Sequence, residues 1–298
     1  MSKIRGAFIV LITPMTEAQE IDWSGLKNNV NYFINQGVAG IVINGSTGEF
    51  VSLSKEERFQ MVEVVMKEVN GRIPVIVGTA AETTKEAIEY TKQAKANGAD
   101  CALVINPYYS KPKDNEVYFH FKQISDAVDI PIMLYNNPFT SGVNMSTELM
   151  LEIGRDCKNV KFIKESSGEI GKARDLARNA KGAFEVFCGS EELVMESYFV
   201  GATGWICVAG NVVPKLVTDM FNYFQNGEIE KAWAINDQIL PLCKFLEGSG
   251  KYVQAIKRSM DLLGQAGGPA RHPRLGLTPE EDKILKDILS NLNLPIHV

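Results

Sequence analysis

The sequence predicts an α/β fold, a (β/α)8 or TIM barrel followed by a C-terminal helical extension. Two observations carry this prediction. Eight short, apolar, β-branched runs recur along the chain, and a polar turn and an amphipathic helical segment follow each run. After Gly227 the strand-like runs stop and only helical segments follow. A doubly wound sheet is the alternative, but eight regular strand–helix units favour closure into a barrel.

The predicted strands are almost continuously apolar, as expected of parallel strands that are covered on both faces. In chain order they are residues 6–14, 40–48, 74–80, 101–109, 131–138, 160–168, 184–190 and 204–211.

The segments between the strands carry helix start and stop signals. Ser54 precedes Glu57 by three residues, the spacing of a capping box, and Gly37 and Gly71 follow helical segments as C-terminal caps do. Helices are predicted over residues 22–37, 54–71, 83–98, 116–128, 146–156, 171–180, 191–201 and 214–227.

The end of the chain is predicted to be a helical extension packed on or beside the barrel. Its helices are expected over residues 228–248, 252–264 and 279–293, with a Gly/Pro-rich connector between the last two. We therefore predict a catalytic barrel over residues 1–227 and an extension over residues 228–298.

The composition excludes several classes of protein. Hydrophobic residues make up 45% of the 298 residues, enough to bury a large core. A formal net charge of -5, from 31 basic and 36 acidic residues, indicates no binding of nucleic acid or of a membrane. No apolar run is long enough to span a bilayer, and Pro14 ends the first run too early for a signal peptide. The five scattered cysteines form no C-x-x-C pair, which indicates reduced thiols and a cytoplasmic location.

Active sites of such barrels lie at the C-terminal ends of the strands, so the residues there are the candidates for chemistry. This rim carries an amine, several phenols, hydroxyl groups and glycine-rich turns, in the motifs GSTGE (45–49), NPYY (106–109), YNNP (135–138), KESSG (164–168), CGSEE (188–192) and ICVAGN (206–211). His120, His272 and His297 lie outside these motifs, and no metal-ligand spacing is present, so no metal site is predicted.

Lys164 stands out among these rim residues. Val160 and Phe162 are expected on one face of a strand, and Lys164 falls on the same face. A buried ammonium group costs free energy unless it is paired or neutral. Lys164 is therefore either a strand-end lysine that reaches water or a reactive amine. A neutral lysine amine can attack a ketone and form a Schiff base, which stabilises an enamine when a substrate bond breaks.

Other rim residues suit the same chemistry. A phenol such as Tyr135 can transfer the proton, and Ser46 could link it to a second phenol, Tyr109. Glycine-rich turns expose N–H groups that can hold a carboxylate. Taken singly, Tyr135 also fits a core tyrosine with a satisfied hydroxyl group.

Taken together and in this order, GSTGE, NPYY, YNNP, the lysine of IKE, CGSEE and GWICVAGN resemble the class I aldolase family of dihydrodipicolinate synthase and N-acetylneuraminate lyase. The resemblance covers nearly the whole chain. It implies a Schiff-base-forming lyase that acts on pyruvate or another 2-keto acid and needs no metal or organic cofactor. It also implies a homotetramer, a dimer of tight dimers.

The resemblance implies a role for each motif residue. Lys164 would form the Schiff base, and Tyr135 would transfer the proton. Ser46 would join Tyr135 to Tyr109, which would reach in from a neighbouring subunit. Together with Thr47, Ser46 would also bind the keto-acid carboxylate. The remaining predicted substrate-binding residues are Gly48, Thr140, Ser166 and, through backbone contacts, Gly189 and Ile206.

One position departs from the pattern of dihydrodipicolinate synthases. In those enzymes an arginine two residues past the proline of Y-N-x-P clamps the carboxylate of aspartate semialdehyde. Here this position holds Thr140, and no arginine lies between Pro138 and Arg155. A threonine cannot make the bidentate charged contact of an arginine. The synthase reaction would need Lys111, Lys113 or a more distant arginine in its place.

The remaining pocket positions are rich in hydroxyl groups, namely Ser141, Ser166, Ser167 and Ser190. Such side chains suit a polyol, although small polar residues are also common at turns. They resemble the branch of the family that cleaves or dehydrates 2-keto-3-deoxy sugar acids. The leading prediction is therefore an aldolase or dehydratase that acts on pyruvate or such a sugar acid. One alternative is 4-hydroxy-tetrahydrodipicolinate (dihydrodipicolinate) synthase, which condenses pyruvate with aspartate semialdehyde. The other is a non-catalytic keto-acid sensor, against which retention of both the lysine and the tyrosine counts.

Overall fold

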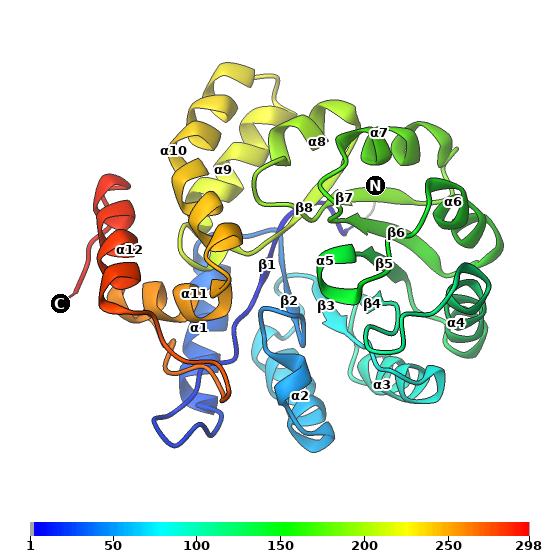
Figure 1. The fold of residues 1–298 in the computed structure, drawn as a ribbon, viewed down its shortest axis with the longest axis horizontal. Coiled ribbons are helices and arrows are strands. Elements are labelled where there is room, and N and C mark those ends of the chain that lie inside the picture. The colour runs from blue at the N-terminus through cyan, green and yellow to red at the C-terminus, as the bar shows by residue number, and fades with distance from the viewer. Residues whose placement is uncertain (1–2, 298) are drawn as a thin grey trace. The chain divides into compact units, whose positions relative to one another are not determined.

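The computed structural model describes residues 3–297, and within this range eight parallel strands close into one barrel in chain order (Figure 1). The fold is the predicted (β/α)8 TIM barrel with a C-terminal helical part, and each predicted strand is confirmed. The strands are β1 (Gly6–Val10), β2 (Gly40–Ile43), β3 (Val75–Gly78), β4 (Cys101–Ile105), β5 (Ile132–Asn136), β6 (Val160–Glu165), β7 (Glu185–Cys188) and β8 (Gly204–Cys207).

Helices follow the strands as predicted. In chain order they are α1 (Trp23–Asn35), α2 (Lys55–Val69), α3 (Thr84–Ala96), α4 (Asp114–Ala127), α6 (Thr147–Asp156), α7 (Ile170–Asn179), α8 (Val194–Val200), α9 (Pro214–Gln225), α10 (Ile229–Gly248), α11 (Tyr252–Leu262) and α12 (Pro279–Asn291). Three short elements were not predicted, namely α5 (Pro138–Ser141) and the 3-10 helices η1 (Phe50–Ser52) and η2 (Ala209–Asn211).

The predicted helix signals act at the ends of α1 and α2. The Ser54 hydroxyl accepts the N–H of Glu57 at 3.1 Å, and the Glu57 carboxylate accepts the N–H of Ser54 at 2.8 Å. This is the capping box expected from the sequence. Gly37 and Gly71 follow the two helices with φ of 74° and 71°, a left-handed conformation that glycine adopts without steric cost.

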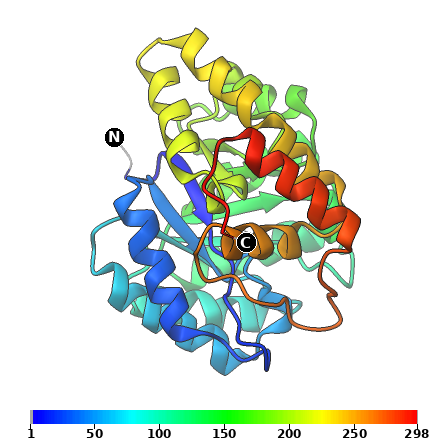
Figure 2. The ribbon, with the colours of Figure 1, turned by 90° about the vertical axis from the view of Figure 1, so that its left-hand side faces the viewer.

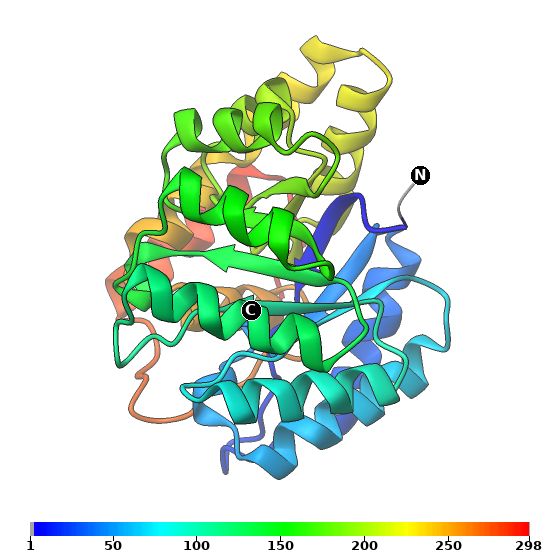
Figure 3. The same cartoon turned by 90° about the vertical axis from the view of Figure 1, so that its right-hand side faces the viewer.

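The described chain divides into two compact units. The first centres on Pro74–Ile206 and the second joins Gly6–Ile73 to residues 207–297. In the first unit, α3, α4, α6 and α7 lie side by side over the strands (Figure 3) and bury an apolar cluster that includes Phe121, Leu134 and Ile163.

In the second unit, the C-terminal helices share a body with the first two strands. Helix α10 packs on α9, α11 and α12 (Figure 2). The Asn29 side chain on α1 donates to the carbonyl of Ala266 at 2.7 Å, and the Asn211 side chain donates to the carbonyl of Val10 at 2.8 Å. These bonds tie the end of the chain to its beginning.

A register shift between β5 and β6 corrects one expectation from the sequence. Ile132 pairs with Val160 but Met133 pairs with Phe162, so Lys161 is an extra residue in β6. Such a bulge reverses the alternation of side chains. Val160 therefore packs in the helix-side cluster with Ile163, and does not share the face of Lys164.

The five cysteines are all buried and free of disulfide bonds, which agrees with the expected core thiols. Among the described residues, no helix is both long and apolar enough to cross a membrane.

Candidate active site

The ends of β5 and β6 bring Tyr135 and Lys164 together. The two residues are partners in the strand register, and both are buried, with 7% and 6% of their surface exposed. The Lys164 Nζ lies 4.0 Å from the centroid of the Tyr135 ring. Across residues 3–297, no carboxylate pairs with this amine and no acceptor hydrogen-bonds to it. Lys164 is thus a buried amine against a phenol, and not a strand-end lysine extended into water.

Asn137 orients the phenol of Tyr135. Its side-chain amide donates to the Tyr135 hydroxyl oxygen at 2.7 Å. The same side chain caps α5, because its Oδ1 accepts the N–H of Thr140 at 3.2 Å. Since the Tyr135 oxygen accepts from Asn137, its own proton stays available for donation to a substrate.

The next pair of strand partners, Asn136 and Glu165, forms a bridge on the other face of the sheet. Asn136 donates to the Glu165 carboxylate at 2.8 Å and accepts the N–H of Met145 at 3.0 Å. The Glu165 carboxylate also accepts the N–H of Ser167 at 2.6 Å. Burial raises the pKa of Glu165, and these hydrogen bonds oppose the shift. The bridge fixes the register of β5 and β6 one residue from Tyr135 and Lys164.

Sequence reasoning gave no role to Asn136, Asn137 or Glu165, although YNNP and IKE were recognised as motifs. Their polar character, at positions that the strand pattern predicts to be buried, was the signal that could have identified them. A buried amide or carboxylate needs partners, and here the partners are the neighbouring strand and the first turn after it.

Gly189 lies directly beside Lys164. Its N–H donates to the carbonyl of Glu165 at 2.8 Å. A Cβ at this position would lie 1.8 Å from the Ser166 Oγ and 2.8 Å from the Lys164 Cε. Any side chain here would displace Lys164 or Ser166, so the site requires glycine.

Ser166 and Ile206 are also buried in the first unit. Ser166 is 6% exposed, and its hydroxyl group has no hydrogen-bond partner within the described chain. Ile206 is fully buried in β8, one residue past the Cys188–Trp205 pair of the β7–β8 ladder. The structure therefore brings together Lys164, Tyr135, Ser166 and Gly189 of the predicted site.

Tyr109 stands apart from this cluster. Its surface is 86% exposed, and it follows β4 in a loop that Glu82 holds in place. The Glu82 carboxylate accepts the N–H groups of Tyr108 and Tyr109 at 2.8 Å each and that of Ser110 at 3.3 Å. Three bonds to consecutive N–H groups fix the backbone from which the exposed ring projects.

Thr140 is an exposed residue of α5, and a lysine packs beside this helix. A Cβ built on Gly142 would lie 2.9 Å from the Cε of Lys111. The side chain of Lys111 therefore packs against Gly142 at the end of α5. Gly142 lies two residues after Thr140 in the sequence. This places a lysine side chain beside α5.

Ser46, Thr47 and Gly48 lie in the second unit, in the turn between β2 and η1. Asn44 and Glu49 flank this turn with φ of 53° and 60°, a conformation that is uncommon for residues other than glycine. The Glu49 N–H donates to the Ser46 carbonyl at 3.1 Å, and the Thr13 hydroxyl donates to the Gly48 carbonyl at 2.7 Å. Thr47 is buried, whereas Ser46 is partly exposed.

No group of three or more His, Cys, Asp or Glu side chains within the described residues could hold a metal ion.

A TIM barrel that buries a lysine beside a phenol at its strand ends has the groups that Schiff-base chemistry requires. Residues 3–292 match the Dihydrodipicolinate synthetase family. The chain belongs to this family and is a lyase.

Known proteins resemble the chain over nearly its whole length. The 4-hydroxy-tetrahydrodipicolinate synthase of Methanocaldococcus jannaschii is 35% identical over 292 residues, which are 97% of this chain and 99% of the relative. The crystal structure of dihydrodipicolinate synthase from Aquifex aeolicus matches with a TM-score of 0.95 and 33% identity over 99% of this chain and 100% of that chain. A structure described as the first monomeric dihydrodipicolinate synthase variant matches with a TM-score of 0.93 and 29% identity over 98% of both chains.

Proposed function

We propose that Lys164 forms a Schiff base with pyruvate or a 2-keto-3-deoxy sugar acid, and that the protein is an aldolase or dehydratase for such acids. One observation carries the proposal. The Lys164 amine is buried 4.0 Å from the centroid of the Tyr135 ring, and no carboxylate of residues 3–297 pairs with it. The amine is thus placed beside a phenol and outside any ion pair of the described residues, where it can attack the ketone of a substrate.

In the proposed reaction, the Lys164 nitrogen attacks C2 of the keto acid, and the carbonyl oxygen takes up a proton. Loss of water from this adduct gives the protonated imine. In the retro-aldol direction, the C3–C4 bond then breaks, its electron pair moves toward the iminium to form an enamine, and the C4 hydroxyl proton passes to a base. The enamine then takes up a proton at C3. Dehydration passes through a different enamine, which keeps the whole carbon chain and forms by removal of a C3 proton from the imine. The C4 hydroxyl group then takes up a proton and leaves as water. In both reactions, hydrolysis of the product imine frees Lys164. We assign the proton transfers to Tyr135, whose hydroxyl oxygen Asn137 orients.

The roles of the remaining predicted residues rest on the family resemblance. Ser46 and Thr47 would hold the keto-acid carboxylate, beside the backbone of Gly48. Ser166, whose buried hydroxyl group has no partner within the described residues, would contact the substrate next to the imine. Gly189 and Ile206 would line the pocket, and Thr140 would contact the distal part of the substrate.

A second candidate is 4-hydroxy-tetrahydrodipicolinate synthase, the name of the relative from Methanocaldococcus jannaschii. The packing of Lys111 against Gly142 favours this candidate, because it supplies a cation beside α5, where the synthases place their arginine. In this reading, Lys111 would bind the carboxylate of aspartate semialdehyde. Lys111→Ala would then lower the rate of condensation and leave Schiff-base formation with pyruvate unchanged.

A substrate panel separates these candidates. The protein would be incubated with pyruvate and aspartate semialdehyde, and separately with 2-keto-3-deoxy hexonic acids, and the products quantified by mass spectrometry. We expect turnover of at least one sugar acid at a higher kcat/KM than condensation. The reverse ranking would establish the synthase candidate. Tight binding of keto acids without turnover of any substrate would indicate a sensor and overturn the proposal.

We also propose that the protein is a homotetramer in which Tyr109 completes the site of a neighbouring subunit. The 86% exposure of Tyr109 on a loop fixed by Glu82 supports this role, because the ring is presented outward on a rigid backbone. Activity and light scattering would be measured together on dilution. Loss of activity with dissociation is expected, and full activity of a monomer would refute the proposal. A cytoplasmic location, in which the five buried thiols stay reduced, also remains a prediction.

A further inference from the structure

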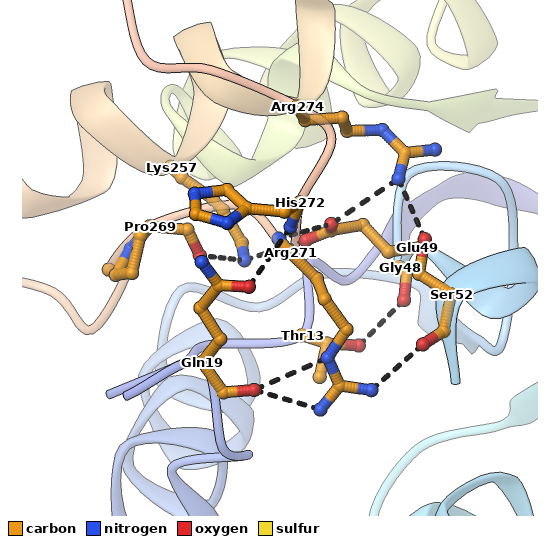
Figure 4. A network of polar contacts seen from close by, with 12 residues as sticks. Thr13, Gln19, Gly48, Glu49, Ser52, Lys257, Pro269, Arg271, His272 and Arg274 are labelled. Carbon is orange, nitrogen blue, oxygen red and sulfur yellow. Dashed lines mark hydrogen bonds and ion pairs between the residues drawn. The ribbon is translucent and has the colours of Figure 1, made fainter. Parts of the chain in front are cut away.

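The turn that carries Ser46 and Thr47 ends in a fully buried carboxylate, that of Glu49. Figure 4 shows this side chain pointing toward the C-terminal part of the chain. Its Oε1 lies 2.6 Å from the Nζ of Lys257. Its Oε2 accepts the N–H of Arg271 at 3.0 Å and lies 3.6 Å from the guanidinium of Arg274. We call these four residues the Glu49 cluster.

Lys257 is the central cation of the Glu49 cluster. It projects from α11 with 1% of its side chain exposed, and its Nζ also donates to the carbonyl of Pro269 at 2.7 Å. Burial lowers the pKa of Lys257, and the Glu49 carboxylate partly offsets this shift. Each charge of the pair is thus buried in the presence of the other, and removal of one leaves the other buried without its main partner.

The two arginines attach the connector between α11 and α12 to the same region. The guanidinium of Arg271 binds both carboxylate oxygens of Glu57 at 2.8 Å each and the carbonyl of Ser52 at 2.8 Å. Arg274 donates to the hydroxyl group of Ser52 at 2.8 Å. Two arginines of the C-terminal part therefore bind Ser52 and Glu57, in the segment that follows the turn.

The contacts of the Glu49 side chain affect the conformation of the Ser46–Thr47 turn, because Glu49 is the residue that closes this turn. Glu49 has a left-handed φ of 60°, and its N–H closes the turn on the Ser46 carbonyl at 3.1 Å. A residue keeps such a conformation only where its surroundings impose it. The surroundings of Glu49 are Lys257, Arg271 and Arg274 on the side-chain side, and Thr13, bonded to the Gly48 carbonyl, on the other.

We propose that Lys257 and Glu49 are positioning residues, which fix the Ser46–Thr47 turn so that it binds the carboxylate of the 2-keto acid. The inference rests on the proposed function, since it assumes that this turn receives the carboxylate. The C-terminal part of the chain then contributes to substrate selection through a buried ion pair, without itself touching the substrate.

Two ketones that differ at the carboxylate test this proposal. The rate of adduct formation would be measured by borohydride trapping and intact-mass spectrometry, with pyruvate and with hydroxyacetone. The ratio of the two rate constants reports recognition of the carboxylate, because both ketones use the same lysine. A purely structural role of the cluster would change both rates together and leave the ratio unchanged.

The decisive variant is the double substitution Glu49→Gln with Lys257→Met, which removes both buried charges together. We expect a thermal midpoint near that of wild type and a pyruvate-to-hydroxyacetone ratio lowered by about 10-fold or more, because small displacements of binding groups have effects of this size. Lys251→Met is the matched control, since it removes a Lys–Glu pair of 2.8 Å to Glu281 in the same part of the chain. Its ratio should equal that of wild type.

Arg274→Met supplies an independent variant should the double variant fail to fold. It removes a partly exposed arm of the cluster, leaves the Lys257–Glu49 pair in place, and should lower the ratio by about 3-fold. The inference would be overturned if the folded double variant had a ratio within about twofold of wild type. If the double variant does not fold, the same result in Arg274→Met would overturn it. Failure of the proposed function looks different, because wild type itself would then form no adduct.

Discussion

The two buried lysines of this protein have opposite surroundings. Lys164, at the end of β6, is 6% exposed and lies against the ring of Tyr135 without a carboxylate partner within residues 3–297. Lys257, on α11, is 1% exposed and pairs with Glu49 at 2.6 Å. The same side chain thus lies outside any ion pair of the described residues in one place and inside a buried ion pair in the other.

The comparison teaches that burial alone does not identify a reactive lysine. A buried ammonium ion beside a carboxylate is stabilised as a charge and has no free lone pair. A buried amine that no carboxylate engages can attack a carbonyl carbon without first breaking an ion pair. The absence of an acidic partner therefore distinguishes Lys164 from Lys257.

The largest expected difference between the two lysines is in activity. Lys164→Met should reduce turnover below detection, since it removes the amine that we propose to form the Schiff base. Its free energy of unfolding should change by only about 1 kcal/mol, because methionine fills a similar volume and no ion pair is lost. Turnover assays and urea unfolding check both values. Residual turnover at a tenth of the wild-type rate would contradict the assignment of Lys164.

Tyr135→Phe should separate imine formation from proton transfer. We expect kcat to fall by about 10²- to 10⁴-fold, the usual contribution of a positioned acid or base. Adduct formation with pyruvate should persist, because the Lys164 amine remains. Steady-state kinetics and borohydride trapping on the same preparation would show this. An unchanged kcat would remove Tyr135 from the mechanism.

Lys257→Met should show the reverse pattern to Lys164→Met. The substitution leaves the Glu49 carboxylate buried without its main partner, which should lower the free energy of unfolding by about 3–5 kcal/mol. A second substitution, Glu49→Gln, should recover most of this loss, and a double-mutant cycle by urea unfolding measures the coupling. If Lys257→Met were as stable as wild type, the ion pair would have no energetic role.

The smallest expected effect concerns the bridge beside the lysine. Glu165→Gln keeps one acceptor oxygen but cannot accept from both Asn136 and Ser167, so one buried donor loses its partner. We expect a loss of about 1–3 kcal/mol in stability. A modest fall in kcat should accompany this loss of stability, because the bridge fixes the register of the two strands that carry Tyr135 and Lys164. Glu152→Gln, an exposed glutamate of α6, is the control and should change neither value.

Much of this fold could be predicted from the sequence because its signals are local. Apolar runs, the Ser54–Glu57 capping box and the glycines after α1 and α2 each act within a few residues. The proximity of Lys164 and Tyr135 could also be predicted, since the strand ends of a barrel meet at one rim.

Features that depend on contacts between distant segments could not be predicted. The side on which Val160 packs depends on a bulge, which the alternation of residues does not reveal. The pairing of Glu49 with Lys257 joins a turn near the start of the chain to a helix near its end. A glutamate in a turn and a lysine in a helix are both ordinary surface residues by sequence pattern, and only the fold buries them together.

The most direct test of the account compares the two lysines in one experiment. Wild type would be incubated with pyruvate and borohydride, digested, and mapped by mass spectrometry at Lys164 and Lys257. We expect a reduced pyruvyl adduct on Lys164 and none on Lys257, and no adduct in Lys164→Met. An adduct that maps to any other lysine, or one that survives in Lys164→Met, would contradict it.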